Sequence, residues 1–188
     1  MPHRKLSRAV LPAIGTARRS LWAFLFYCLT MVSIGRSAEQ QFDETELKAA
    51  YLYNFAYFVT WPDTSRDFIF CTYANSPVSA TLARLIEGEH LHDQPLRILI
   101  DPLPNQLRDC RVIYIPAQQE RVLASTLEFV RSLPILTVSD VADFEQRGGM
   151  VRLASEERRI LPVIQLKNVT RTGLTVSSKL LRSSRIVE

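Results

Sequence analysis

The sequence predicts an α/β fold: a three-layer sandwich in which helices flank a mostly parallel sheet of about five to six strands, with one C-terminal hairpin. The first observation is an alternation, after residue 37, of short β-branched and aromatic runs with longer segments whose apolar residues recur at helical spacing. The second is length, because the roughly 150 residues that remain suit one ordinary domain with its own core.

Asp43 and Thr45 open the first helix of this domain, since both residue types favour helix N-termini. We expect it to end before Pro62, because the residue that precedes a proline is pushed out of helical geometry. Its dense aromatic side chains are typical of a core-facing stripe, although the excess also suits docking to a partner. Further strands are predicted at 68–73, 96–100, 111–115, 134–138, 150–154 and 160–167, and further helices at 77–86, 118–131, 139–147 and from the Gly173 region to about Arg185.

The N-terminal segment has the layout of an export signal. Residues 1–20 contain basic residues and no acid, residues 21–34 carry no charge, and small residues follow up to Ala38. This order predicts a cleavable signal peptide over residues 1–37, followed by a folded domain over residues 38–188. A membrane anchor is the alternative, but a helix over residues 21–34 rises only about 21 Å, short of the ~30 Å hydrocarbon core. Two further alternatives remain. The pair Arg18-Arg19 could direct export by the twin-arginine route, and Cys28 could be the site of lipid attachment.

Removing this leader changes the charge of the protein. Residues 1–37 hold six of the 23 Lys and Arg residues and none of the 19 acids, so the exported chain carries 17 basic and 19 acidic side chains. The basic character of the full chain therefore belongs to its leader. We expect no nucleic-acid partner, because nucleic-acid binding needs clustered cationic side chains on the folded domain.

Two cysteines remain in the exported chain, Cys71 and Cys110. An even pair in an oxidising compartment is typical of a disulfide. Two buried free thiols are the alternative. In the chain-entropy model a bond that closes a loop of this length stabilises a domain by about 4 kcal/mol, comparable to the whole net stability of a marginal domain.

Motifs of enzymes are absent from the sequence: it has no G-x-S-x-G, no H-E-x-x-H and no phosphate-binding glycine loop. His90 and His92 lie beside Asp93 in a polar loop, and two imidazoles without a third ligand make a weak metal site. We therefore expect no catalytic residue, no metal and no cofactor.

The turn that contains Thr137, Ser139 and Asp140 is the candidate ligand turn. It follows the carboxyl end of a predicted strand, where open α/β sheets bind ligands. Hydroxyls and a helix start there suit a small polar or anionic group. Capping of the next helix is the structural alternative.

Four blocks together resemble one family, the YfiR-like periplasmic proteins. They cover nearly the whole domain in the expected order and are KAAYLYNFAYFVTWP (48–62), the pair Cys71 and Cys110, ILTVSDVADFEQRGGMV (135–151) and GLTVSSKLLRSSRIV (173–187). The resemblance implies a periplasmic α/β domain without catalytic activity. It implies a regulator that inhibits a membrane-bound diguanylate cyclase, YfiN, by binding its periplasmic part, which lowers cyclic di-GMP and restrains biofilm growth.

The resemblance also implies further partners, namely an OmpA-like outer-membrane lipoprotein that sequesters the inhibitor and a second copy of the chain in a homodimer. One departure concerns a second cysteine pair that some members carry around the double glycine. Here the neighbourhood offers Glu145 and Arg152 instead, so only one structural disulfide carries over.

A partner-binding surface is predicted near the C-terminus. The candidate residues are apolar side chains with a basic rim, namely Leu174, Val176, Lys179, Leu181 and Arg182. One face of this segment must also seal the core, so part of the set is structural. The competing hypotheses are a sensor module that binds a small molecule near residues 137–140 and, more distantly, an enzyme.

Overall fold

The computed structural model describes residues 43–65 and 67–188. The predicted signal peptide and Cys28 lie outside the described residues. Within the described residues, every helix is too short or too polar to cross a membrane. The helices and strands are, in chain order, α2 (Glu44–Phe58), β1 (Val59–Thr60), β2 (Phe68–Thr72), α3 (Pro77–Leu85), β3 (His90–Leu91), β4 (Gln94–Ile100), η1 (Pro104–Asp109), β5 (Val112–Ile115), η2 (Ala117–Val122), α4 (Leu123–Val130), β6 (Leu136–Ser139), β7 (Val151–Glu156), β8 (Arg159–Gln165), α5 (Leu166–Arg171), β9 (Thr175–Val176), α6 (Ser178–Arg182) and β10 (Arg185–Val187).

The main sheet has eight strands in the order β10-β8-β7-β6-β5-β2-β4-β3. Strands β4, β2, β5, β6 and β7 run parallel to one another, which confirms the mostly parallel α/β fold. β7 and β8 form the predicted antiparallel hairpin. The prediction of five to six strands was too low, because β3 and β10 are short edge strands without a clear periodic signal.

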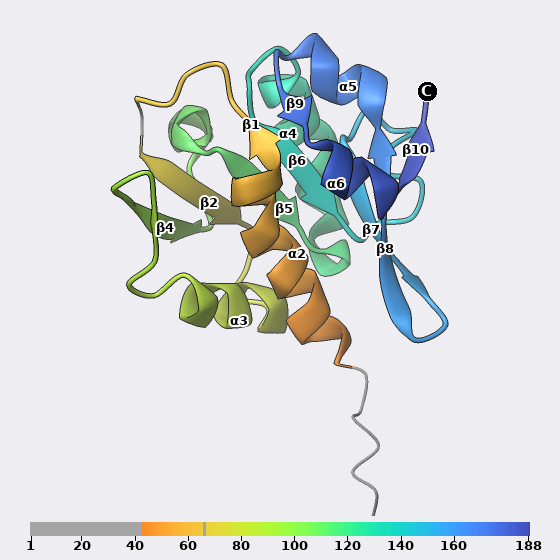
Figure 1. The fold of residues 1–188 in the computed structure, drawn as a ribbon, viewed down its shortest axis with the longest axis horizontal. Coiled ribbons are helices and arrows are strands. Elements are labelled where there is room, and N and C mark those ends of the chain that lie inside the picture. Colours follow the sequence, from red (N-terminus) through yellow and green to blue (C-terminus); the bar gives the residue numbers. More distant parts are fainter. Residues whose placement is uncertain (1–42, 66) are drawn as a thin grey trace, which may run out of the picture. The chain divides into compact units, whose positions relative to one another are not determined.

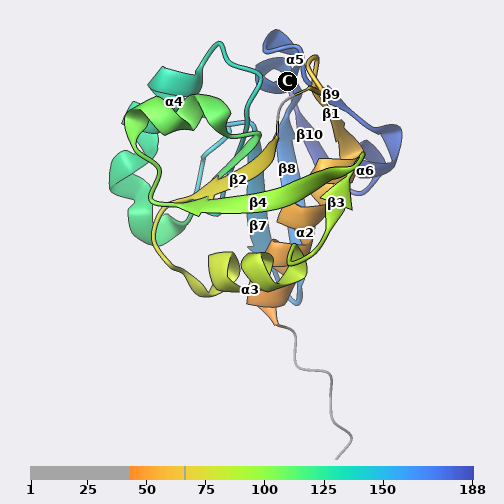
Figure 2. The same cartoon turned by 90° about the vertical axis from the view of Figure 1, so that its left-hand side faces the viewer.

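Two hydrophobic clusters lie on opposite faces of the sheet, because successive side chains of a strand point to opposite sides. In β5, Val112 and Tyr114 join the cluster under α2 and α3, whereas Ile113 and Ile115 join the cluster under α4. Figures 1 and 2 show α2 and α6 on one side of the sheet and α4 on the other. This arrangement is the predicted three-layer sandwich.

Helix α2 is capped at its N-terminus by Asp43, whose carboxylate accepts hydrogen bonds from the backbone N–H groups of Thr45 and Glu46. Its buried residues recur every three to four positions, so one face packs on the sheet; they are Lys48, Ala49, Leu52, Phe55 and Ala56. The helix ends earlier than Pro62 alone predicts, because Val59 and Thr60 pair with β9 as a separate two-stranded ribbon.

Two predicted helices were wrong in extent. Residues 142–148 form consecutive turns rather than a helix, and Asp143 has a left-handed φ of 55° that a helix does not accommodate. The segment predicted as one helix from the Gly173 region to Arg185 contains β9, the five-residue α6 and β10. Strand pairing with distant partners, β1 and β8, overrides the local apolar spacing.

Candidate functional site

The candidate site lies at the carboxyl edge of the parallel strands. The chain passes from β2 through α3 to β4 and then crosses back to β5, on the other side of β2. The loops that follow β2 and β5 therefore diverge to opposite faces of the sheet, α3 on one and η2–α4 on the other. Open α/β sheets bind ligands at such a switch point.

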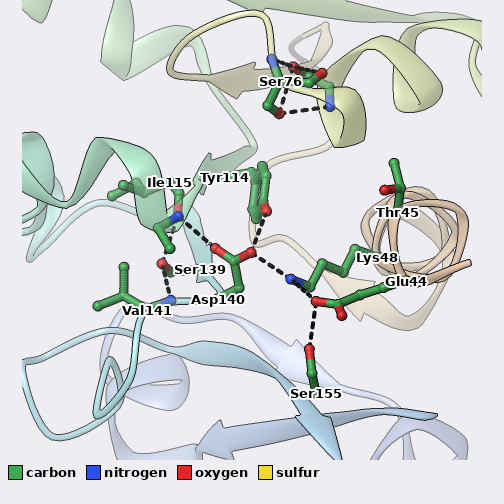
Figure 3. Close-up of polar contacts among 12 residues, drawn as sticks. Glu44, Thr45, Lys48, Ser76, Tyr114, Ile115, Ser139, Asp140, Val141 and Ser155 are labelled. Carbon is green, nitrogen blue, oxygen red and sulfur yellow. Dashed lines mark hydrogen bonds and ion pairs between the residues drawn. The ribbon is translucent and has the colours of Figure 1, made fainter. Parts of the chain in front are cut away.

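Asp140, which directly follows β6, makes most of the polar contacts at this edge of the sheet. Its Oδ2 accepts hydrogen bonds from Lys48 Nζ at 2.6 Å and from the Tyr114 hydroxyl at 3.2 Å. Its Oδ1 accepts one from the backbone N–H of Ala117 at 2.7 Å. Figure 3 shows the carboxylate of Asp140 between the side chains of Lys48 and Tyr114, which come from α2 and β5. Ala117 begins η2. Asp140 thus connects the end of β6 to α2 and to the junction of β5 and η2.

The network continues through Lys48 to α2 and β7. Lys48 Nζ also lies 2.6 Å from Glu44 Oε1, and the hydroxyl of Ser155 donates to the same oxygen at 2.6 Å. The Lys48 side chain is only 8% exposed and the Asp140 side chain 13%, so this is an ion pair largely removed from water. The Glu44 side chain is 44% exposed, so this end of the network contacts solvent.

Burial and hydrogen bonding set the protonation states of these groups. Burial opposes the charge of Lys48, but its hydrogen bonds to Asp140 and Glu44 outweigh this effect and hold the pKa of its ammonium above its ordinary value. The hydrogen bond from Lys48 lowers the pKa of Glu44. Burial, followed by the nearby charge of Asp140, raises the pKa of the Tyr114 phenol. The ammonium and the Glu44 carboxylate therefore stay charged at neutral pH, and Tyr114 stays a neutral donor.

A polar cavity of about 280 Å³ opens beside this network. Its walls include Ser76 and Pro77 at the start of α3, Gln118 after β5, and Lys48 and Asp140. The hydroxyls of Ser76 and Ser79 cap α3 in a reciprocal capping box, so they already have backbone partners. The cavity presents charges of both signs, and the described residues bring no three metal-ligating side chains together.

Of the predicted ligand turn, only Asp140 lines this cavity. Thr137 and Ser139 are buried, at 1% and 0% exposure. Thr137 Oγ1 accepts from the N–H of Met150, while the Ser139 hydroxyl donates to Ile115 O and accepts from the N–H of Val141. Their role is to fix the strand ends, which corrects their assignment as ligand contacts. The sequence did not identify Lys48 as a site residue, because it lies 92 positions from Asp140. The one signal for it was a charged residue in the otherwise apolar, buried stripe of the first helix.

The predicted partner surface is only partly accessible. Leu174 and Val176 are buried, at 1% and 8% exposure, because β9 and the residue before it pack into the core under α2. This corrects their assignment as partner contacts in the described conformation. Lys179 and Arg182 are exposed and Leu181 is half buried. Figure 1 shows α6, which carries these three residues, beside α2 at the front of the sheet.

Cys71 and Cys110 form a disulfide with a Cα–Cα distance of 5.8 Å, in agreement with the predicted pairing. Both residues are buried in the cluster under α4, and the bond connects β2 to the residues just before β5.

In place of a second cysteine pair around the double glycine, this chain has an ion pair between Glu145 and Arg152. Arg152 donates to both oxygens of Glu145, at 2.7 and 2.9 Å, and so clamps the turns after β6 to β7.

Fold and site together define the class of protein: a disulfide-bonded three-layer α/β domain with a charged crevice at the switch point of its sheet. A family model matches residues 45–185, more than half of the chain, and the chain belongs to the YfiR/HmsC-like family. This confirms the resemblance that the sequence blocks carry. A comparison with curated proteins finds no match.

Several solved structures match the chain, and two of them illustrate the shared fold. One is a conserved domain protein from Vibrio cholerae O1 biovar El Tor strain N16961, with a TM-score of 0.50 and 11% identity over 77% of this chain. The other is the ABC domain in complex with L-Trp from Streptococcus pneumoniae, with a TM-score of 0.50 and 10% identity over 75% of this chain. The chain spans 60% of each of those two chains. At such identity the likeness establishes the fold alone.

Proposed function

We propose that the protein is a non-enzymatic periplasmic regulator that binds and inhibits the periplasmic part of a membrane-bound diguanylate cyclase and so lowers cyclic di-GMP. The observation that carries this proposal is membership of the YfiR/HmsC-like family over residues 45–185. The predicted signal peptide and the Cys71–Cys110 bond support an oxidising compartment outside the cytoplasm.

Inhibition of this kind requires only differential binding. A regulator that prefers the inactive conformation of its target shifts the target toward that conformation. A 100-fold preference corresponds to about 2.7 kcal/mol of coupling free energy. The chain therefore needs a specific surface for the cyclase rather than a catalytic centre.

The surface that we propose for the cyclase is the accessible side of α6: Lys179, Leu181 and Arg182. Lys179 Nζ lies 5.1 Å from the centre of the Phe58 ring, so the basic edge of this surface contacts the last residue of α2. One small cavity between α2 and α6 reaches the buried Leu180. An apolar centre with a basic rim is a common composition for protein interfaces.

Charge substitution on α6 tests this surface. Leu181→Glu and Arg182→Glu should fail to lower cyclic di-GMP in a strain that lacks the native gene, because each places a negative charge in the proposed contact. The matched control is Arg131→Glu at the end of α4, on the other side of the sheet, where the arginine is 64% exposed. It should repress like the unaltered protein. If folded, abundant α6 variants repress normally, α6 is not the contact.

An OmpA-like outer-membrane lipoprotein that sequesters the regulator, and a homodimer, belong to the same proposal. Both follow from the family resemblance. Co-purification of the exported protein from cross-linked cell envelopes, with identification of the bound proteins by mass spectrometry, tests the three partners at once. Recovery of neither a cyclase nor such a lipoprotein would count against the regulator.

A sensor module that binds a small polar molecule is the second candidate. The observation that favours it is the charged cavity of about 280 Å³ at the switch point, where Asp140 and Lys48 meet. A molecule bound there would raise the thermal unfolding temperature of the protein, and Asp140→Asn would abolish the rise. Unchanged cyclic di-GMP after gene deletion, together with such a rise, would favour the sensor over the regulator.

A further inference from the structure

Residues 158–188 are strongly basic, whereas the rest of the exported chain is acidic. Seven of the 17 Lys and Arg residues of the exported chain lie after residue 157, but only one of its 19 acids, Glu188, does. Residues 158–188 therefore carry a formal charge of +6, and residues 38–157, with ten basic and 18 acidic side chains, carry −8. The nearly neutral total of the exported chain conceals this separation of charge.

The fold gathers part of this basic segment beside β8, near one edge of the main sheet. α5 begins directly after β8, and β10 pairs with β8 so that Val187 lies beside Gln165, the last residue of β8. Two residues separate the end of α6 from β10. Figures 1 and 2 show α5, α6 and β10 on the same side of the domain. Four exposed cations of these elements form what we call the basic surface: Lys167 and Arg171 on α5, Arg182 at the end of α6 and Arg185 on β10.

Acidic side chains offset little of the charge of the basic surface. Arg185 pairs with Glu156 at 2.9 Å, but its side chain is 52% exposed, and exposed ion pairs are weak. Lys167, Arg171 and Arg182 have no acidic partner within the part of the chain that the structure describes. At least three of the four cations are therefore available to an anion from outside the chain.

The distribution of these cations suits a flat anionic surface better than the centre of a protein interface. Interface centres are depleted of charge and rich in apolar side chains. On α5 the exposed residues are Lys167, Thr170 and Arg171, all polar, and β10 adds Ile186 at 38% exposure. An anionic lipid surface attracts separate cations at the same time. Because the predicted leader directs the chain out of the cytoplasm, the extended polyanion that it meets is a membrane rather than nucleic acid.

We propose that the basic surface holds the protein against the anionic phospholipid headgroups of a membrane. The attraction is electrostatic and reversible, since it falls off within a Debye length of about 8 Å at physiological ionic strength. This membrane contact goes beyond the regulation of a cyclase and does not depend on it. Lys167 and Arg171 lie on α5, outside the cyclase surface that we propose on α6, so they allow the two contacts to be tested separately.

Co-sedimentation with lipid vesicles tests the membrane contact, with the protein purified from the periplasm of an expressing strain. The protein should sediment with phosphatidylcholine vesicles that contain about 30% phosphatidylglycerol and not with vesicles of phosphatidylcholine alone. NaCl at about 1 M should release it, because the Debye length then shrinks to about 3 Å. Absence of binding to the phosphatidylglycerol vesicles, or equal binding to both kinds of vesicle, would overturn the proposal.

Substitutions locate the contact on the basic surface. Lys167→Gln combined with Arg171→Gln should weaken binding to the phosphatidylglycerol vesicles about 25-fold, or about fivefold for each charge removed. The matched control is Arg84→Gln combined with Arg97→Gln, which changes the net charge equally through two exposed arginines on α3 and β4. It should bind like the unaltered protein, and circular dichroism should show both double variants folded.

Two results would refute this assignment. Equal weakening by the two double variants would mean that the total charge, rather than the basic surface, governs binding. Saturable binding of polyglutamate by the unaltered protein, without binding to the phosphatidylglycerol vesicles, would assign the surface to an acidic protein instead of a membrane.

Discussion

Replacing Lys48 by Met tests whether the network at Asp140 fixes α2 to the sheet. The ammonium lies 2.6 Å from both Asp140 Oδ2 and Glu44 Oε1, and its side chain is 8% exposed. Removing one partner of a buried pair costs about 3–5 kcal/mol, because the other charge stays buried without it. Asp140 keeps the Tyr114 hydroxyl and the Ala117 N–H, so we expect the lower end, about 3 kcal/mol.

Urea unfolding followed by circular dichroism measures this cost as a fall in the free energy of unfolding at unchanged slope. The matched control is Arg97→Met, because Arg97 pairs with Asp67 at 3.0 Å but the two side chains are 59% and 49% exposed. That pair should contribute less than about 1 kcal/mol. A loss for Lys48→Met no larger than that of Arg97→Met would refute the reasoning. The double variant Lys48→Met with Asp140→Asn should recover part of the loss.

Three further outcomes are expected. Replacing Cys71 and Cys110 by Ala should lower the free energy of unfolding by about 4 kcal/mol, because the bond closes a loop with a sequence separation of 39. If both cysteines of the denatured, unreduced protein react with a thiol-labelling reagent, the bond is contradicted. Hydrogen bonds from Arg152 hold the pKa of Glu145 below its usual value, so the stability from this pair is present above the unfolded pKa of about 4.3 and lost as pH falls through the folded pKa; Glu145→Gln should be less stable at neutral pH and lose less on acidification. Export should remove the leader between Gly35 and Ala38, and mass spectrometry of the periplasmic protein that shows an intact N-terminus would contradict the signal peptide.

Local patterns predicted most of the fold. The strand predicted at 68–73 is β2, and the helix predicted at 77–86 is α3, because a proline at the first helical position and Ser76 before it are strong start signals. The helix predicted at 118–131 is η2 followed by α4, since Gln119 interrupts helical geometry. β1 and β9 could not be predicted, because each two-residue strand exists only through pairing with the other, more than 100 positions away in the sequence.

The candidate site was predictable only in part. Asp140 follows a strand, and strand ends are where α/β proteins bind ligands, so its position was visible in the sequence. Thr137 and Ser139 share that position, but their hydroxyls turn inward to backbone partners, which a sequence does not reveal. Lys48 and Asp140 meet only through the packing of α2 on the sheet, so their pairing is a tertiary property.

Cellular cyclic di-GMP tests the central claim most directly. Deleting the gene should raise cyclic di-GMP, and the full-length chain supplied from a plasmid should restore the lower level. A chain that begins with a methionine followed by residues 38–188 should accumulate in the cytoplasm and fail to restore it, because the proposed contact lies in the periplasm. An unchanged level after deletion, or full repression by the leaderless chain, would contradict a periplasmic inhibitor of a diguanylate cyclase.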